Sequence, residues 1–199
     1  QGKVLYLGIS DTPAWIVSQA NTMADLRGWS PFVALQIEYS LIARTPERDL
    51  LPMARALDLA VTPWGILGSG VLTGKYGKGG GSAEGRASEG RGKDPEMLRI
   101  ADEVSAVAED LGCTPTQAAV AWIRDQPGVM VPLLGSRTVE QLRDNLGGLD
   151  VTLGNMHLQR LDQATAIDLG FPLEFLARDH IRNLVHAGTY DQIDNHRRG

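Results

Sequence analysis

Residues 131–149, VPLLGSRTVEQLRDNLGGL, place two small residues and an arginine where a predicted strand meets a predicted helix. Gly135 lets a ligand approach the backbone, Ser136 offers a hydroxyl, and Arg137 can make forked contacts with an oxyanion. A helix N-terminus behind a strand binds phosphate because its backbone N–H groups and its dipole attract negative charge. These residue types therefore indicate a phosphate-binding turn.

Two polar residues on the following helix extend this turn. Gln141 and Asn145 lie one helical turn apart, on one face with position 137 or 138, where they are placed to reach the polar edge of an adenine. Another interpretation stays open for the same residues. Thr138 and Gln141 also have the spacing of a capping box, and Arg137 also suits a solvated surface charge.

A second candidate segment, TPWGILGSGVLTGKY, follows the third predicted strand. Trp64 stands at the end of that strand, where a flat indole can stack on a planar ring. Gly65, Gly68 and Gly70 follow it and would let a pyrophosphate lie against the backbone. The alternative is that Trp64 is a core residue and the glycines form turns.

The first two predicted strands also end in polar residues. Ser10 and Asp11 close the first strand, and Gln36 interrupts the apolar second strand. A buried amide needs a partner, so Gln36 is a candidate to pair with a ligand amide. Glu38 alternates to the same face as Gln36, but no partner for it can be identified in the sequence.

The elements that must position these residues alternate between short apolar strands and amphipathic helices. Strands are expected at residues 4–9, 33–37, 59–64 and 129–133. Helices are expected after Thr12-Pro13 and Thr45-Pro46, at 95–111, after Thr114-Pro115, at 138–146 and at 156–167. Four successive strand–helix units predict an α/β fold with a parallel sheet, and four strands are half of an eight-stranded barrel. We expect a single domain over 1–199, with the βα units in 1–149 and an extra helix and tail in 150–199.

The long segment 74–93 is rich in glycine and charge, and it is interpreted as a lid rather than a linker. The chain begins with Gln1 directly before a strand, which predicts a processed or truncated chain.

Composition argues against several classes of partner. The 199 residues are 43% hydrophobic and 22% charged, as in ordinary globular proteins. The net charge of −5 is not accompanied by basic blocks, which argues against nucleic acid and anionic membranes. No apolar run approaches the ~20 residues of a membrane span, and no signal peptide is visible. The single Cys113 excludes an internal disulfide and favours a reducing cytoplasm.

These four strand ends resemble the aldo-keto reductase family, NADP(H)-dependent enzymes with a (β/α)8 TIM barrel. GKVLYLGISDTPAW is similar to the fifth strand of the family and VALQIEYSL to the sixth. PWGILGSGVLTGKY is similar to the seventh, and VPLLGSRTVEQLRDNLGGL to the eighth strand and its helix. The tail GFPLEFLARDHIRNLV resembles bacterial members with a Ser-Asp variant of the Ser-Asn motif. The resemblance implies that the chain is the C-terminal half of such a barrel.

The resemblance also implies roles for individual residues. Ser10, Asp11 and Gln36 would hold the nicotinamide carboxamide, Trp64 would stack under the ring, and Gly65, Leu67 and Gly70 would line the pyrophosphate path. Ser136 and Arg137 would bind the 2′-phosphate of NADPH, with Gly135 in the same cofactor site and Gln141 and Asn145 near the adenine. Two positions depart from the family pattern. Asp11 replaces the commoner Asn and can only accept a hydrogen bond from the amide, and Gly65-Ile66 replaces the usual Ser-Pro.

The resemblance implies no catalytic residue in this chain and no metal site. The Tyr, Lys, Asp and His of the family lie on its first four strands, and nothing here aligns with them. The leading hypothesis is therefore the cofactor-binding part of an NADPH-dependent reductase of aldehydes or ketones. The alternatives are a catalytically inactive NADPH-binding or regulatory barrel subunit, and a plain βα structural module.

Its expected partners are a small carbonyl substrate and either the missing N-terminal half barrel or a second copy. The fifth and eighth strands would each have an open edge, and open edges invite association.

Overall fold

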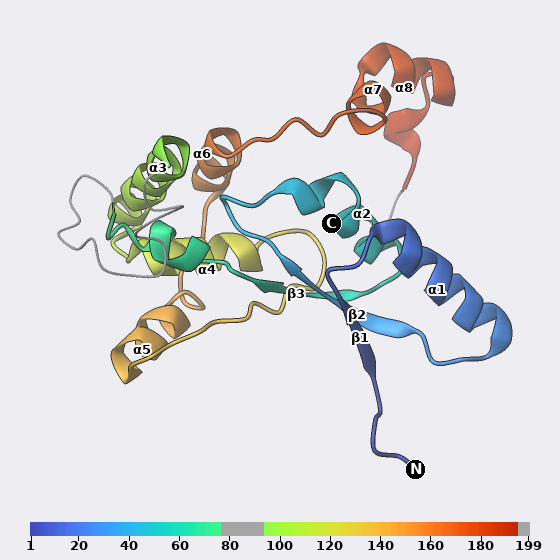
Figure 1. Cartoon of the computed structure of the whole chain (residues 1–199). Coiled ribbons are helices and arrows are strands. Elements are labelled where there is room, and N and C mark those ends of the chain that lie inside the picture. Colours follow the sequence, from blue (N-terminus) through green and yellow to red (C-terminus); the bar gives the residue numbers. More distant parts are fainter. Residues whose placement is uncertain (77–93, 195–199) are drawn as a thin grey trace.

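The computed structural model describes residues 1–76 and 94–194 (Figure 1). Its centre is a parallel sheet of order β1-β2-β3. The strands are β1 (Leu7–Ser10), β2 (Phe32–Glu38) and β3 (Ala60–Trp64). This arrangement confirms the predicted α/β class with a parallel sheet, and the predicted first strand begins later than expected.

The expected fourth strand is present only as an isolated bridge between Val61 and Met130. Residues 129–133 still run beside β3: Val61 N donates to Val129 O at 2.8 Å, Val131 N to Val61 O at 2.8 Å, and Leu133 N to Pro63 O at 2.9 Å. The prediction of a regular strand was wrong because Pro63 has no N–H to complete the ladder. The chain follows the path of a fourth strand with an interrupted ladder.

Helix ends follow local signals where a side chain or a glycine fixes them. Helix α3 (Pro95–Leu111) has the predicted bounds, with Asp94 accepting from Glu96 N and Met97 N, and Gly112 in the left-handed region at its end. Helix α4 (Pro115–Arg124) begins at a capping box formed by Thr114 and Gln117. Both starts confirm the predicted Pro at the first helical position.

Two predicted helix starts were wrong in detail. Helix α1 (Ala14–Arg27) begins after Pro13, because the Thr12 hydroxyl donates to the Ser10 carbonyl instead of capping the helix. The segment after Thr45 forms a short 3₁₀ helix, η1 (Thr45–Arg48), and α2 (Leu50–Ala56) begins behind it, with Pro52 in its first turn as expected.

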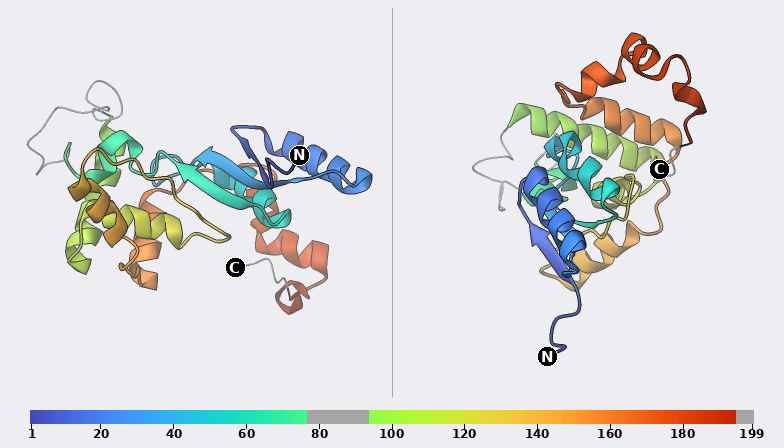
Figure 2. Two further views of the ribbon diagram at one scale, coloured as in Figure 1. Left: turned by 90° about the horizontal axis from the view of Figure 1, so that it is seen from below. Right: turned by 90° about the vertical axis from the view of Figure 1, so that its right-hand side faces the viewer.

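The remaining helices complete the described chain. They are η2 (Gly68–Thr73), α5 (Val139–Gly147), α6 (Asn155–Ala164), α7 (Leu173–Ala177), α8 (Asp179–His186) and η4 (Tyr190–Gln192). Helix α6 ends before the predicted residue 167. Helices α3 to α6 gather at one end of the sheet and α1 lies beside the other, while α7 and α8 stand apart behind an extended linker (Figure 2). The predicted lid lies outside the described residues from position 77 to 93.

The two faces of the sheet differ in character. Leu35, Ile37 and Val61 point to one face and are buried in the core. The neighbouring positions Gln36 and Trp64 point to the opposite face and are exposed. One face therefore supports the fold, and the other presents polar and aromatic groups.

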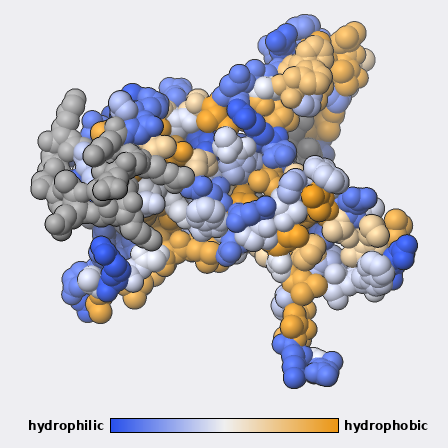
Figure 3. Space-filling view, in the orientation of Figure 1, coloured by the Kyte–Doolittle hydropathy of each residue, from blue (hydrophilic) through white to orange (hydrophobic). Residues whose placement is uncertain are grey.

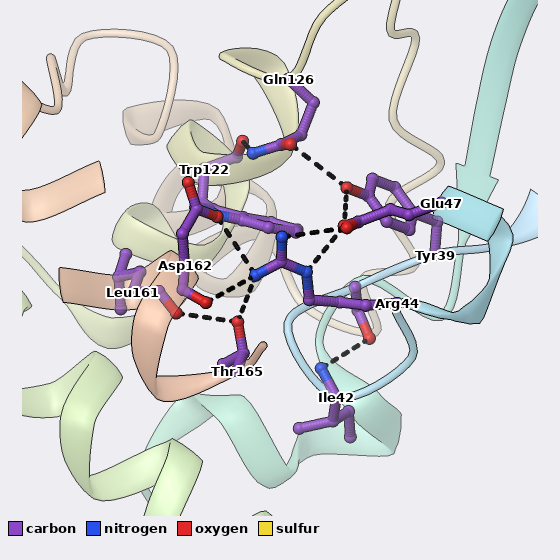
Figure 4. A network of polar contacts seen from close by, with 10 residues as sticks. Tyr39, Ile42, Arg44, Glu47, Trp122, Gln126, Leu161, Asp162 and Thr165 are labelled. Atoms are coloured by element: carbon purple, nitrogen blue, oxygen red, sulfur yellow. Dashed lines mark hydrogen bonds and ion pairs between the residues drawn. The ribbon is translucent and has the colours of Figure 1, made fainter. Parts of the chain in front are cut away.

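A polar network joins the end of β2 to α4 and α6 (Figure 4). The Arg44 guanidinium donates to both carboxylate oxygens of Glu47, at 2.6 and 3.0 Å. Its Nη1 donates to Thr165 Oγ1 at 2.7 Å and to the Asp162 carbonyl at 3.0 Å, and lies 3.2 Å from Asp162 Oδ1. One side chain thus connects residues more than a hundred positions apart.

Two buried aromatic residues complete this network. The Tyr39 hydroxyl donates to Glu47 Oε1 at 2.7 Å, and burial together with the Glu47 carboxylate raises the pKa of Tyr39. Trp122 Nε1 donates to Asp162 Oδ1 at 3.1 Å, while its ring lies 5.2 Å below the Arg44 guanidinium. Tyr39 and Trp122 are both fully buried, so the charged groups of Arg44 and Glu47 pack directly against side chains of the core.

We expect Arg44→Ala to lower the free energy of unfolding by about 3 kcal/mol, because it takes the positive charge away from the carboxylates of Glu47 and Asp162 and leaves them only neutral donors. Urea unfolding followed by far-ultraviolet circular dichroism measures this change. Arg143→Ala, at an exposed arginine of α5, is the control and is expected to change stability by less than about 0.5 kcal/mol. An equal loss in the two variants would contradict a structural role for the network.

Candidate functional site

A cleft of about 1000 Å³ opens at the carboxyl end of β3. One wall comes from the end of β3 and the segment after it, and it carries Trp64, Gly65, Leu67 and Gly70. The other wall comes from the turn before α5 and from α5 itself. It carries Gly135, Ser136, Arg137, Gln141 and Asn145. The floor includes the start of α4. The structure therefore brings together two sequence segments that were predicted separately, in a space large enough for an extended ligand.

The glycine-rich wall exposes backbone at Gly65 and Gly70, which carry no side chain. Gly65 has φ 69° and Gly70 has φ 97°, which disfavour side chains. A Cβ at Gly70 would stand 3.0 Å from Cε and Nζ of Lys75, so the ammonium group lies over this part of the backbone. The wall thus offers both close approach and a positive charge.

Lys75 lines the cleft and was missed as a site residue. Its Nζ lies 4.8 Å above the ring of Tyr76. The available signal was a cation directly behind the glycine-rich segment, in the quoted GKY. Ser69, Thr73 and Asp144 also line the cleft and were not singled out.

Trp64 is 37% exposed and stands at the mouth of the cleft. It pairs in register with Glu38 of the neighbouring strand, and a Cβ on Gly65 would lie 3.4 Å from the Glu38 carboxylate. An indole in this position has a face available to a planar ring. The alternative of a fully buried core tryptophan applies instead to Trp122.

Ser10, Asp11 and Gln36 meet at the ends of β1 and β2 but do not line the cleft. Ser10 pairs in register with Gln36, and Asp11 N donates to the Gln36 carbonyl at 3.2 Å. Asp11 has φ 47°, a conformation that Asp and Asn adopt more readily than other side chains. The backbone thus explains why either residue suits this position. By register, Ser10 and Gln36 share the exposed face with Trp64.

The turn before α5 is held by the helix behind it. Thr138 Oγ1 accepts from Gln141 N at 3.2 Å, as an N-cap should. The Gln141 side chain, however, accepts from Arg137 N at 2.8 Å, one residue earlier than a capping box requires. Asn145 Nδ2 donates to Ser136 Oγ at 2.8 Å. Gln141 and Asn145 therefore both bind the turn.

The carboxylate of Glu140 takes up part of the hydrogen-bonding capacity at the N-terminus of α5. The backbone N–H of Glu140 and the Thr138 hydroxyl hold the pKa of the Glu140 carboxyl below its usual value. Among the described residues, the Arg137 guanidinium has no hydrogen bond or ion pair. The group left to meet an anion is therefore the Arg137 side chain, with the exposed Ser136 hydroxyl beside it.

Helix α5 is seated closely on α4. Asp144 Oδ1 accepts from Thr114 Oγ1 at 2.7 Å and from Gln117 Nε2 at 3.1 Å. A Cβ on Gly148 would stand 2.7 Å from Cβ of Val120, closer than packed carbons approach. The absence of a side chain at this glycine allows the contact that positions the α5 wall of the cleft.

We expect Gly148→Ala to destabilise the protein by about 1–3 kcal/mol, because the added methyl group overpacks the α4–α5 contact. Gly154→Ala is the control: its φ of −71° is as compatible with alanine as the −63° of Gly148, and its Cβ would meet only His157 Nδ1 at 3.8 Å. It should lose less than about 1 kcal/mol, the cost of alanine at the N-cap of α6. Urea midpoints measure both. A tolerated Gly148→Ala would mean that α5 shifts freely on α4.

Comparison with known proteins agrees with this architecture. The profile of the Aldo/keto reductase family matches residues 1–166. A probable aryl-alcohol dehydrogenase of Saccharomyces cerevisiae is 36% identical over 189 residues, which cover 90% of this chain and 56% of that protein. The norsolorinic acid reductase of Aspergillus flavus is 35% identical over 178 residues, 88% of this chain and 44% of that protein. The aryl-alcohol dehydrogenase (NADP(+)) of Phanerodontia chrysosporium is 34% identical over 203 residues, 96% of this chain and 52% of that protein.

In α/β proteins with a parallel sheet, ligands bind in the crevice at the carboxyl edge of the strands, which is where this cleft opens. The chain belongs to the aldo/keto reductase family. It spans about half the length of the curated relatives it matches. These three relatives are fungal, so the expected likeness to bacterial members is not confirmed.

Two further observations concern the described part of the chain. Residues 1–76 and 94–194 contain no helix with the length and apolar character needed to cross a membrane. Within the same ranges, no three His, Cys, Asp or Glu side chains gather as a metal site would require.

Proposed function

We propose that this chain is the cofactor-binding part of an NADP(H)-dependent reductase of aldehydes or ketones, and that it supplies the fifth to eighth strands of a (β/α)8 barrel. The observation that carries the proposal is the cleft itself, in which Trp64 and the glycine-rich wall face Ser136 and Arg137. An NADP(+)-linked relative that matches 96% of the chain supports the same cofactor.

The donor set fits a phosphorylated dinucleotide. Arg137 and Ser136 would hold the 2′-phosphate at one end, Gly65, Leu67 and Gly70 would line the pyrophosphate path, and Lys75 adds a positive charge. Trp64 would lie under the nicotinamide ring, with Ser10, Asp11 and Gln36 holding its carboxamide. When bound, NADPH supplies the hydride that reduces the carbonyl carbon to an alcohol. The names of the fungal relatives support aromatic carbonyl compounds as the substrate class.

We expect NADPH to quench tryptophan fluorescence of the chain, since Trp64 stands at the cleft mouth. Arg137→Ala should raise the Kd for NADPH by about 10- to 100-fold, the value of a hydrogen bond to a charged group, and leave the Kd for NADH unchanged. Arg143→Ala, on helix α5 but outside the cleft, should change neither. No fluorescence response up to millimolar NADPH would defeat the proposal.

We also propose that the open edges of the sheet are completed by an N-terminal half barrel that carries the Tyr, Lys, Asp and His of the family. Strand β1 pairs only with β2 among the described residues, and Val4, Leu5 and Tyr6 before it are 68%, 79% and 78% exposed. This apolar N-terminal segment projects from the molecule (Figure 3). Exposed strand edges with apolar side chains pair with other strands.

A cytoplasmic location stays a prediction from the single Cys113.

In the absence of that half, we expect the chain to self-associate through the same edges. Sedimentation equilibrium should give a mass above that of one chain, and Tyr6→Lys should shift it toward the monomer, because a charge at an edge opposes pairing. Met156→Lys, at a similarly exposed apolar residue of α6, is the control and should leave the mass unchanged. A wild-type chain that is monomeric at all concentrations would count against open edges.

A further inference from the structure

We propose that the outer face of helix α1 is an interface between two copies of this chain, in which the two α1 helices pack antiparallel about a two-fold axis beside Gln19. This face, the α1 stripe, consists of Trp15, Ile16, Gln19, Met23 and Leu26. None of these residues lines the cleft, so the interface is separate from the proposed cofactor site.

The α1 stripe is exposed although most of it is apolar. Trp15 is 68% exposed, Met23 41% and Leu26 79%. The buried side of the same helix carries Ala14, Val17, Asn21 and Ala24. At 3.6 residues per turn, the stripe lies roughly 180° from that buried side. Helix α1 therefore has apolar side chains on both sides, whereas the outer side of a surface helix is normally polar.

A pair of hydrogen bonds fixes the rotation of α1 about its own axis. Asn21 is buried, and its Nδ2 donates to the carbonyl of Phe32 at 2.9 Å. In return, Phe32 N donates to Asn21 Oδ1 at 2.9 Å. The Asn21 amide thus binds both backbone groups of the first residue of β2. Turning α1 to bury the stripe would break both bonds, so the stripe can only be covered from outside.

Completion of the sheet would not cover the α1 stripe. Helix α1 lies at the periphery of the described chain (Figure 2). In a (β/α)8 barrel the helices form an outer ring around the strands, so further strands and helices would be added beside β1 and beside α1. The stripe faces away from the sheet. A contiguous exposed apolar surface of this kind marks a site of protein–protein contact.

The chemistry of the α1 stripe fits a second copy of the same surface. The chain has a net charge of −5, but the stripe contains no charged side chain, so two copies can meet there without repulsion. Closed two-fold dimers are the commonest protein oligomers, and they require such a self-complementary surface.

Gln19 places the two-fold axis. It stands at the middle of the stripe, four residues from both Trp15 and Met23, and among the described residues its amide makes no hydrogen bond. An amide both donates and accepts, so it complements a second amide. An axis beside Gln19 pairs it with its own copy and lays Trp15 against Met23 of the second copy.

Sedimentation equilibrium tests the interface in a Tyr6→Lys background, which removes association through the open strand edges. The Tyr6→Lys chain should keep the mass of two chains, and adding Met23→Lys should give the mass of one. An interface substitution costs about tenfold in affinity. The two-fold axis places it in the interface twice, so the Kd of the dimer should rise about 100-fold.

Met156→Lys in the same background is the matched control, because it changes a more exposed methionine on α6. It should leave the mass of two chains. A Tyr6→Lys chain that is monomeric at all concentrations, or equal effects of Met23→Lys and Met156→Lys, would overturn the proposal. The proposed cofactor function would be unaffected by either result.

A disulfide cross-link tests the position of the axis. In a chain with Cys113→Ala, which removes the native thiol, Gln19→Cys should cross-link to its own copy under oxidising conditions. Packed helices lie about 8–10 Å apart between their axes, which brings facing residues within range of a disulfide.

Asp25→Cys in the same Cys113→Ala chain is the control, at an exposed position of the same helix. It lies six residues from the axis, so its two copies would be about 18 Å apart and should not cross-link. Cross-linking of neither variant, or of both equally, would overturn the antiparallel arrangement. If Met23→Lys prevents folding, this cross-link decides the proposal.

Discussion

The contacts of the Arg44 guanidinium link the segment after β2 to the helices packed beside the cleft. The guanidinium binds Glu47 of η1, shortly after β2, and reaches Asp162 of α6 and Thr165 at the end of that helix, while Trp122 of α4 lies against it. The start of α4 forms part of the cleft, and α4 in turn seats α5. The place of the turn before α5 relative to the sheet is therefore fixed by successive contacts, from Arg44 to α4 and from α4 to α5.

Sequence reasoning succeeded where the deciding interaction is local. The bounds of α3 and the starts of α3 and α4 depend on a capping side chain and a proline within four residues. It was wrong where distant partners decide. The strand expected at 129–133 is interrupted because its neighbour is Pro63, and the Arg44 network joins residues whose proximity no local pattern records.

The candidate site divides in the same way. Residue types were enough to single out Gly135, Ser136 and Arg137, and the structure places them opposite Trp64 in one cleft. The partners of Gln141 and Asn145 could not be predicted, because an amide that can reach a base can equally reach its own turn. Lys75 was overlooked because its relevance comes from its place over Gly70, and a lysine in a polar segment is common.

The contrast between the two faces of the sheet bears on how this protein can change over evolution. Substitutions at Leu35 or Val61 alter the packed side and are filtered by whether the chain folds. Substitutions at Gln36 or Trp64 alter the open side, where less packing is lost, and are filtered by what the protein binds. Neighbouring positions of one strand, such as Leu35 and Gln36, are thus under different selective pressures. Ligand preference can therefore change during evolution while the fold is conserved.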